Sequence, residues 1–362
     1  NFSHGMIPQH IVIYNIKSWK CATARQFKSS NIPIPSYNGK SWFNKQYWLQ
    51  ITTTKNQKYW FSFEQFETAK NWKEEMNNVM NAIKCTENNI PNNIRISEKD
   101  VSKGRPIGKG AAASVFRGTL NQNTVAIKEF YAQPNMEEHR EFLDEMEMLS
   151  SLHHPNIIRL FGGFINKSQS PCIVMEYASR GSLNSVLYDS MTDLTSSLKL
   201  QFIQQIAQAL NYLHTFNPPI IHRDLKPSNI LVLEDWSVKL TDFGSSKKVD
   251  STMTSGQGTV KWMAPEVLTS SNYNEKADIY SFSLIMWEVL MLQNFFTEYK
   301  FDSQIEIQVV EHHKRPHIPE NISSSLKQLI EDCWNPDPTL RPSSTHILNR
   351  LNDLSPQDFE IE

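Results

Sequence analysis

The segment HRDLKPSNIL places a carboxylate, an ammonium group and a carboxamide close together in the chain, at Asp224, Lys226 and Asn229. Transfer of a phosphoryl group requires metal ligands, a group that orients the attacking hydroxyl, and a cation near the developing charge. Asp242, in TDFGSS, supplies a second carboxylate. These four residues therefore predict phosphoryl-transfer chemistry, if the surrounding elements bring their side chains together.

A glycine-rich turn precedes these residues. The stretch IGKGAAASVFRG contains short β-like runs, and the next run, TVAIKEF, carries Lys128. Backbone amides in such a turn can approach a polyphosphate, and a lysine one strand later can neutralise its charge. Each feature alone is common in proteins without this chemistry. Glu145 lies on the apolar face of a helix predicted for residues 135–152, where a carboxylate is costly unless it pairs with a cation such as Lys128.

Five motifs, GKGAAASV, VAIK, HRDLKPSN, DFG and APE, occur in an order that resembles the protein kinase family, over roughly residues 101–351. The resemblance implies ATP and Mg²⁺ as cofactors. Lys128 resembles the lysine that holds the ATP phosphates and pairs with Glu145. Asp224 resembles the catalytic aspartate, and Lys226 the cation near the transferred phosphate. The resemblance also implies two magnesium ligands, which are Asn229 and Asp242.

The segment IVMEYASRGSL resembles the kinase hinge, with Met175 as the gatekeeper and residues 176–178 offering backbone hydrogen bonds to adenine. The nucleotide-binding residues implied by the resemblance are Ile107, Gly108, Gly110, Val115, Ala126, Lys128, Met175, Glu176, Ala178 and Leu231. Ala113 stands where the family has the third glycine of its loop. This departure removes no charge or ligand, so we expect it to tune the loop.

Two further residues are expected to have structural roles in the kinase domain. Arg341, in LRPS, resembles the arginine that pairs with the glutamate of APE, which is Glu266. Asp278 resembles the aspartate that braces the catalytic loop. The resemblance therefore implies that both residues support the site without taking part in the chemistry.

The residues after the catalytic aspartate indicate which hydroxyl is phosphorylated. LKPSN resembles serine/threonine enzymes, and GTVKWMAPEVL, which begins just before Thr259, resembles the tyrosine-kinase-like group, which is serine/threonine-specific. The expected function is transfer of the ATP γ-phosphate to serine and threonine hydroxyls of protein substrates in intracellular signalling. The alternatives are a dual-specificity kinase and a nucleotide-binding pseudokinase scaffold. The presence of Lys128, Asp224 and Asp242 argues against the scaffold.

The loop between DFG and APE is rich in serine and threonine. One interpretation is an ordinary solvated loop. The other is that phosphate on a hydroxyl within residues 251–255 pairs with Arg223 and aligns Asp224. The sequence leaves both interpretations open.

The first quarter of the chain differs in charge from the rest. Residues 1–95 contain 12 Lys and Arg against 5 Asp and Glu, whereas the remainder contains 24 against 33. YWLQITTT and QKYWFSF predict a hairpin, and an amphipathic helix follows over residues 64–84. Together they resemble the C-terminal half of a pleckstrin-homology domain. The basic excess is compatible with an anionic lipid such as a phosphoinositide or with a protein partner; nucleic acid is not expected, because no reader motif is present.

The predicted fold class is α+β. We expect a bilobal protein kinase fold, with a small β-rich N-lobe and a larger helical C-lobe, preceded by a pleckstrin-homology-like β-barrel capped by a C-terminal helix. The predicted domains are residues 1–85 for the pleckstrin-homology-like domain, which is short for a whole barrel, 86–100 for a linker, 101–353 for the kinase domain and 354–362 for a tail.

Composition limits the compartment and the class of protein. The four cysteines form no C-x-x-C pair, so neither a zinc site nor a disulfide framework is predicted. The most apolar segment, IYSFSLIMWEVLML, is shorter than the roughly 20 residues that span a bilayer, and we expect a buried helix. A cytoplasmic protein, with recruitment to a membrane surface as the alternative, fits these features. Because the chain begins with Asn, we expect it to be part of a longer protein.

Overall fold

The computed structural model divides the chain into two compact units, Asn1–Pro91 and Asn92–Glu362. The residues that the structure describes are 16–23, 47–53, 58–63, 90–110, 113–131, 136–168, 170–248, 259–270 and 273–360.

The first unit contains a three-stranded antiparallel sheet in the order β1-β2-β3. Its strands are β1 (Ile16–Thr23), β2 (Tyr47–Thr53) and β3 (Lys58–Phe63). The pairing of β2 with β3 confirms the predicted hairpin. The helix predicted for residues 64–84 lies outside the described residues, so the pleckstrin-homology-like barrel remains a prediction.

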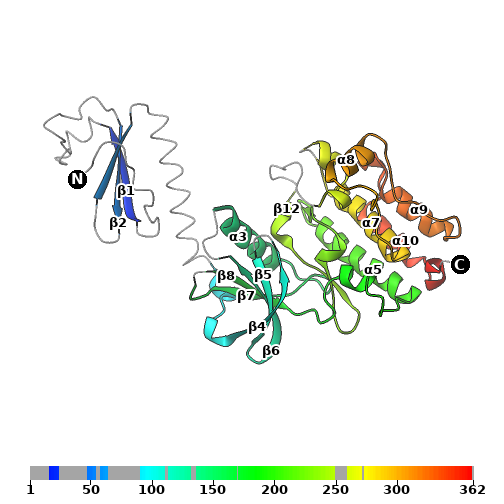
Figure 1. Cartoon of the computed structure of the whole chain (residues 1–362), viewed down its shortest axis with the longest axis horizontal. Coiled ribbons are helices and arrows are strands. Elements are labelled where there is room, and N and C mark those ends of the chain that lie inside the picture. The colour runs from blue at the N-terminus through cyan, green and yellow to red at the C-terminus, as the bar shows by residue number, and fades with distance from the viewer. Residues whose placement is uncertain are drawn as a thin grey trace. The chain divides into compact units, whose positions relative to one another are not determined.

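The second unit begins with a lobe built on a five-stranded antiparallel sheet in the order β4-β5-β6-β8-β7 (Figure 1). The strands are β4 (Val101–Lys109), β5 (Ala113–Leu120), β6 (Asn123–Phe130), β7 (Leu160–Ile165) and β8 (Pro171–Glu176). A cluster of buried side chains forms its core: Val125, Ile127, Phe164, Cys172 and Val174. The β-rich lobe predicted from the short apolar runs is therefore confirmed.

Helix α3 (Met136–Ser151) packs on this sheet, as its contacts with β7 and β8 show. It buries Phe142, Met146 and Leu149, whose spacing places them on one helical face. The Phe142 ring meets Phe130 of β6 edge-on, with 5.5 Å between centroids. The helix predicted for residues 135–152 is thus confirmed to within one residue at each end.

The segment that enters the small lobe packs against the edge strand β7. It contains two short 3-10 turns, η2 (Asn92–Ile94) and η3 (Glu98–Asp100). The Ile96 amide donates to the Gly163 carbonyl over 3.0 Å, and the Ile96 side chain packs on the core of the lobe. The second half of the predicted linker therefore lies on the sheet.

The rest of the unit is mainly helical, as expected for the C-lobe, and forms a larger lobe (Figure 1). Its helices are α4 (Leu183–Leu187), α5 (Ser196–His214), α6 (Pro265–Thr269), α7 (Lys276–Met291), α8 (Asp302–Val310), α9 (Ser324–Cys333) and α10 (Ser344–Asn352). Helix α7 is buried from Ala277 to Leu290, which confirms the buried helix predicted there. None of the helices in the described part of the chain is long and apolar enough to cross a membrane.

The C-terminal end packs on the helical lobe. The turn η8 (Pro356–Phe359) contacts α5 and α9. Phe359 is 1% exposed, and the Ser323 hydroxyl bonds to the Asp358 carboxylate over 2.5 Å. Residues 356–359, which the sequence assigned to a tail, therefore contribute to the core of this lobe.

Short strands position the polar motifs between the two lobes. HRDLKPSN lies between β9 (Ile220–Ile221) and β10 (Ile230–Val232), and its last residues form the turn η4 (Pro227–Asn229). β10 pairs with β11 (Val238–Leu240), and β9 pairs with β12 (Lys247–Lys248). Asp242 follows β11 by two residues. The two strand pairings therefore hold HRDLKPSN and TDFGSS next to each other.

Candidate active site

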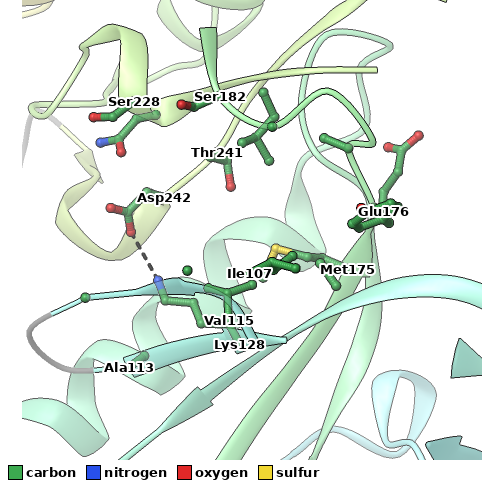
Figure 2. A pocket seen from close by; sticks show the side chains of 18 of the residues that line it. Ile107, Ala113, Val115, Lys128, Met175, Glu176, Ser182, Ser228, Thr241 and Asp242 are labelled. Atoms are coloured by element: carbon green, nitrogen blue, oxygen red, sulfur yellow. Dashed lines mark hydrogen bonds and ion pairs between the residues drawn. The ribbon is translucent and has the colours of Figure 1, made fainter. Parts of the chain in front are cut away.

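A cavity of about 670 Å³ is lined by residues of both the sheet and the helical lobe. Figure 2 shows Ile107, Val115 and Lys128 on the sheet side, facing Thr241 and Asp242 across the opening. Every predicted nucleotide-binding residue lines this cavity: Ile107, Gly108, Gly110, Val115, Ala126, Lys128, Met175, Glu176, Ala178 and Leu231. Glu145, Asn229 and Asp242 line it as well.

Lys128 joins the sheet, α3 and the segment after β11. Its Nζ lies 2.9 and 2.7 Å from the two carboxylate oxygens of Glu145 and 3.1 Å from Oδ1 of Asp242. The Glu145 side chain is 2% exposed, and the ion pair with Lys128 offsets the free-energy cost of burying its charge. Burial alone would lower the pKa of Lys128, but the two carboxylates outweigh it and raise that pKa. The lysine is thus held as a cation.

Asp242 has a left-handed backbone, with φ 64°, an uncommon conformation for a residue with a side chain. The conformation lies at the start of η5 (Phe243–Ser245), and the carboxylate points toward Lys128 (Figure 2). Burial would raise the pKa of Asp242, but the charge and hydrogen bond of Lys128 lower it below its ordinary value. The carboxylate is therefore ionised at neutral pH.

The polar groups of HRDLKPSN are bonded to one another. Lys226 Nζ lies 2.7 Å from Asp224 Oδ2, and Asn229 Nδ2 donates to the backbone oxygen and Oδ2 of Asp224 over 2.8 and 2.9 Å. Thr259 completes the group, since its hydroxyl accepts from Lys226 over 2.6 Å and donates to Asp224 Oδ1 over 3.0 Å. Tertiary structure thus brings Thr259 to residues that are more than thirty positions away in the chain.

Asp278, at the start of α7, holds the backbone of the same loop. Its carboxylate accepts hydrogen bonds from the amides of His222 and Arg223 over 2.8 and 3.0 Å, and lies 3.0 Å from His214 Nε2. Burial would raise the pKa of Asp278, but these bonds lower it. The predicted bracing role of Asp278 is therefore confirmed.

Arg341 forms the predicted pair with Glu266. Its two terminal nitrogens lie 2.7 and 2.8 Å from the two carboxylate oxygens, a bidentate arrangement. The Arg341 side chain is fully buried and also donates to the carbonyls of Asn335 and Lys276. The pair therefore joins α6 to the segment that precedes α10.

Several cavity residues were missed by the sequence motifs. They are the hydroxyl-bearing residues Ser182, Ser185, Ser228, Thr241 and Ser245. Ser182 caps α4 by accepting from the Ser185 amide over 3.2 Å, so a helix-start signal could have pointed to it. Ser228, Thr241 and Ser245 lie within the HRDLKPSN and TDFGSS segments, next to residues that were predicted, whereas Ser185 belongs to none of the motifs.

Arg223 was expected to receive a phosphate from the loop between DFG and APE. Its guanidinium bonds to the Ser245 carbonyl and lies 3.4 Å from the Tyr273 hydroxyl. The candidate phosphorylation sites within residues 251–255 lie outside the described residues, so this hypothesis remains untested.

The family model for protein tyrosine and serine/threonine kinases matches residues 101–351. The chain belongs to this protein kinase family. The matched range covers both lobes around the cavity, so the bilobal kinase fold expected from the motifs is confirmed. Members of the family use ATP and Mg²⁺.

Curated relatives match the same part of the chain. It is 39% identical over 261 residues to serine/threonine-protein kinase CTR1 of Arabidopsis thaliana, covering 70% of this chain and 32% of that protein. It is 35% identical over 265 residues to the dual specificity protein kinase shkA of Dictyostelium discoideum, covering 72% and 50%. It is 34% identical over 263 residues to mitogen-activated protein kinase kinase kinase 7 of Bos taurus, covering 72% and 44%. The kinase domain is therefore related to serine/threonine kinases, and the chain spans half or less of the length of these relatives.

Proposed function

We propose that this chain is a protein serine/threonine kinase that transfers the γ-phosphate of ATP to hydroxyls of protein substrates. One observation carries the proposal. Lys128 lies within hydrogen-bond distance of both Glu145 and Asp242, beside a cavity that reaches Asn229. A cation fixed between two carboxylates is poised to hold phosphate oxygens, and phosphoryl transfer depends mainly on such positioning.

ATP fits the cavity with its base between the lobes. Ala126 of β6 and Leu231 of β10 come from opposite lobes, and both line the cavity. Met175, the residue before the last of β8, is 5% exposed and also lines the cavity. The backbone of residues 176–178 would then meet the edge of adenine.

Asn229 and Asp242 suit Mg²⁺ by their chemistry. Because Nδ2 of Asn229 donates twice to Asp224, its carbonyl oxygen is the atom available to a cation. Among the described residues, no group of three or more His, Cys, Asp or Glu could hold a metal ion. A two-residue site agrees with Mg²⁺, which is usually bound by one or two protein ligands together with substrate phosphates. Mg²⁺ held by Asn229 and Asp242 would supply positive charge that neutralises the phosphates of the nucleotide.

Asp224 and Lys226 would act on the acceptor side. The Asp224 carboxylate is the group that would orient the acceptor hydroxyl and take its proton, and Lys226, 2.7 Å away, would supply the nearby positive charge. The Thr259 hydroxyl keeps these two side chains in place. This arrangement supports a serine or threonine acceptor, as does the similarity to serine/threonine kinases.

The relatives also support assignment of the kinase domain to the tyrosine-kinase-like group, because they include mitogen-activated protein kinase kinase kinase 7 and CTR1. One relative is named as a dual specificity kinase, so phosphorylation of tyrosine in addition to serine and threonine is the alternative. The pseudokinase scaffold is the less favoured candidate, since Lys128, Asp224 and Asp242 are all present.

The test is to incubate the purified chain and its Asp242→Asn variant with labelled ATP, Mg²⁺ and a generic protein acceptor, and then to identify the phosphorylated amino acid. Phosphoserine or phosphothreonine from the parent chain alone is the expected result. Phosphotyrosine in addition would establish dual specificity. No transfer, even after treatment with an activating kinase, would favour the scaffold.

For the first unit we propose a pleckstrin-homology-like domain that recruits the kinase to a membrane surface or to a protein. The basic excess of residues 1–95 supports this role, since each basic residue near an anionic surface contributes roughly 1 kcal/mol. Flotation with liposomes that contain or lack phosphoinositides tests it. No binding at low salt would remove the lipid role and leave the protein partner.

A further inference from the structure

Tyr131 contacts the glycine-rich turn from outside the β4–β5 hairpin. It directly follows β6 and lies three positions after Lys128. Its hydroxyl donates a hydrogen bond to the Gly110 carbonyl oxygen over 2.9 Å. The Ser114 hydroxyl lies 3.4 Å from the same oxygen of Tyr131 and bonds to it. One phenol group is thus bonded to both sides of the turn.

The strand register explains why Tyr131 reaches this place. β5 and β6 are paired as far as Ala113 and Phe130, so the next residue of β6 extends beyond the paired end, beside the turn. Inside the hairpin, the Gly110 amide donates to the Ala113 carbonyl over 2.8 Å. The amide and the carbonyl of Gly110 are therefore both bonded, one within the hairpin and the other to Tyr131.

Glycine has more conformational freedom than any other residue, and Gly110 lines the cavity. A hydrogen bond to its carbonyl restrains the peptide plane that follows it. Amides in such a turn bind phosphate only when they are oriented toward it. A restraint on Gly110 therefore acts on the part of the site that meets phosphate, at the opposite end from the hinge residues.

We infer that Tyr131 is a positioning residue that holds the glycine-rich turn for the phosphates of the nucleotide, which rests on the proposed binding of ATP in this cavity. Tyr131 acts through Gly110 and does not line the cavity itself. Its hydroxyl contributes to the binding of phosphates, whereas the binding of the adenine ring does not depend on it.

The test compares the whole chain with its Tyr131→Phe variant, which keeps the ring and removes the hydroxyl. Binding of ATP, ADP and adenosine is measured by calorimetry in the presence of Mg²⁺. A neutral hydrogen bond corresponds to a factor of about three to ten in affinity. We expect ATP and ADP to bind about three- to tenfold more weakly to the variant, and adenosine to bind equally to both proteins. In steady-state kinetics, the KM for ATP should change more than kcat does.

Tyr299→Phe is the matched control, because it removes a phenol that accepts from Lys314 over 2.5 Å and does not line the cavity. This control should bind all three ligands as the parent does. Unchanged ATP affinity in Tyr131→Phe would overturn the role of Tyr131. An equal loss of affinity for adenosine and for ATP would also overturn it, because such a loss would indicate a general change in the small lobe. If the parent chain itself bound no ATP, the proposed function would fall, and the role of Tyr131 with it.

Discussion

Lys128 lies 2.7 Å from one carboxylate oxygen of Glu145 and 3.1 Å from Asp242, so a strand, a helix and the segment after a short hairpin meet at one ammonium group. Glu145 is buried, whereas Asp242 is partly exposed toward the cavity. The pair with Glu145 therefore fixes the lysine, and the Asp242 side leaves space for a nucleotide. This relationship links the position of α3 to the proposed chemistry.

Replacing Lys128 by Met should abolish most of the kinase activity. Removal of a preorganised charge that stabilises a transition state costs about a hundredfold or more in kcat. The measurement is the rate of peptide phosphorylation at saturating ATP. Lys103→Met is the matched control, because Lys103 pairs with Glu129 over 2.6 Å on the exposed side of the same sheet. Loss of activity in both variants would show a general effect on the sheet.

The Thr259 hydroxyl should matter for turnover more than for ATP binding. Thr259→Val keeps the shape and removes the bonds to Asp224 and Lys226, so we expect kcat to fall about tenfold, with little change in KM for ATP. Thr259→Ser keeps the hydroxyl and should retain most of the activity. Equal rates for the valine and serine variants would contradict this role.

Breaking the Arg341–Glu266 pair should destabilise the helical lobe. Glu266→Ala leaves the buried guanidinium without its carboxylate, which typically costs about 3–5 kcal/mol in the free energy of unfolding. Urea unfolding followed by tryptophan fluorescence measures the change. The exposed pair of Lys314 and Glu298 offers the control, since Glu298→Ala should leave the unfolding midpoint unchanged. A small effect at Glu266 would mean that the carbonyl acceptors suffice for Arg341.

Gly162 should not tolerate a side chain. Its φ is +147°, and a Cβ there would overlap the Ile94 carbonyl of the segment that packs on β7. Gly162→Ala is therefore expected to lower the free energy of unfolding by about 2 kcal/mol or more. Gly181→Ala has a positive φ of +76° but no atom closer than 4.0 Å, so it shows the backbone strain alone. If both variants lost the same stability, the contact with Ile94 would not matter.

The Asp278 carboxylate should make the free energy of unfolding decrease at acid pH. Its folded pKa is lowered, so the stability it contributes is present above its unfolded pKa of about 3.9 and is lost as the pH falls through the folded pKa. Asp278→Asn should reduce the free energy of unfolding by about 2 kcal/mol between about pH 5 and 8. Urea unfolding at a series of pH values should show this difference shrinking below about pH 4. A difference that grew toward low pH would contradict the assignment.

The motifs predicted much of the site because each one also encodes its own local geometry. VAIK is a strand that ends in a lysine, and the α3 segment carries Glu145 among apolar residues, where a buried charge needs a partner. The Lys128–Glu145 pair was therefore predictable and is present, and the Arg341–Glu266 pair that the family resemblance implied is present as well. Helices α3 and α7 were predictable from the apolar patterns of their segments.

Short elements were harder to predict. Helix α4, with five residues, is too brief to show a periodic pattern, and β9 and β12 contain two residues each. Such elements form because distant segments pair, as Ile221 does with Lys247. Isolated segments of this length are not stable in water, so their own sequence carries little information.

The sequence by itself determined the chemistry and the family of this protein, because charged groups that must be buried together are recognisable by type and order. Tertiary structure decided which other residues join them. Thr259 meets Asp224, and Tyr131 meets Gly110, through contacts between segments that have no shared pattern in the chain. The physical reason is the cost of leaving each group without a partner. A hydroxyl can be exposed to water at little cost, so the surrounding sequence does not reveal its hydrogen-bond partner. A buried carboxylate or guanidinium requires a partner, and its type and position in the sequence therefore point to one.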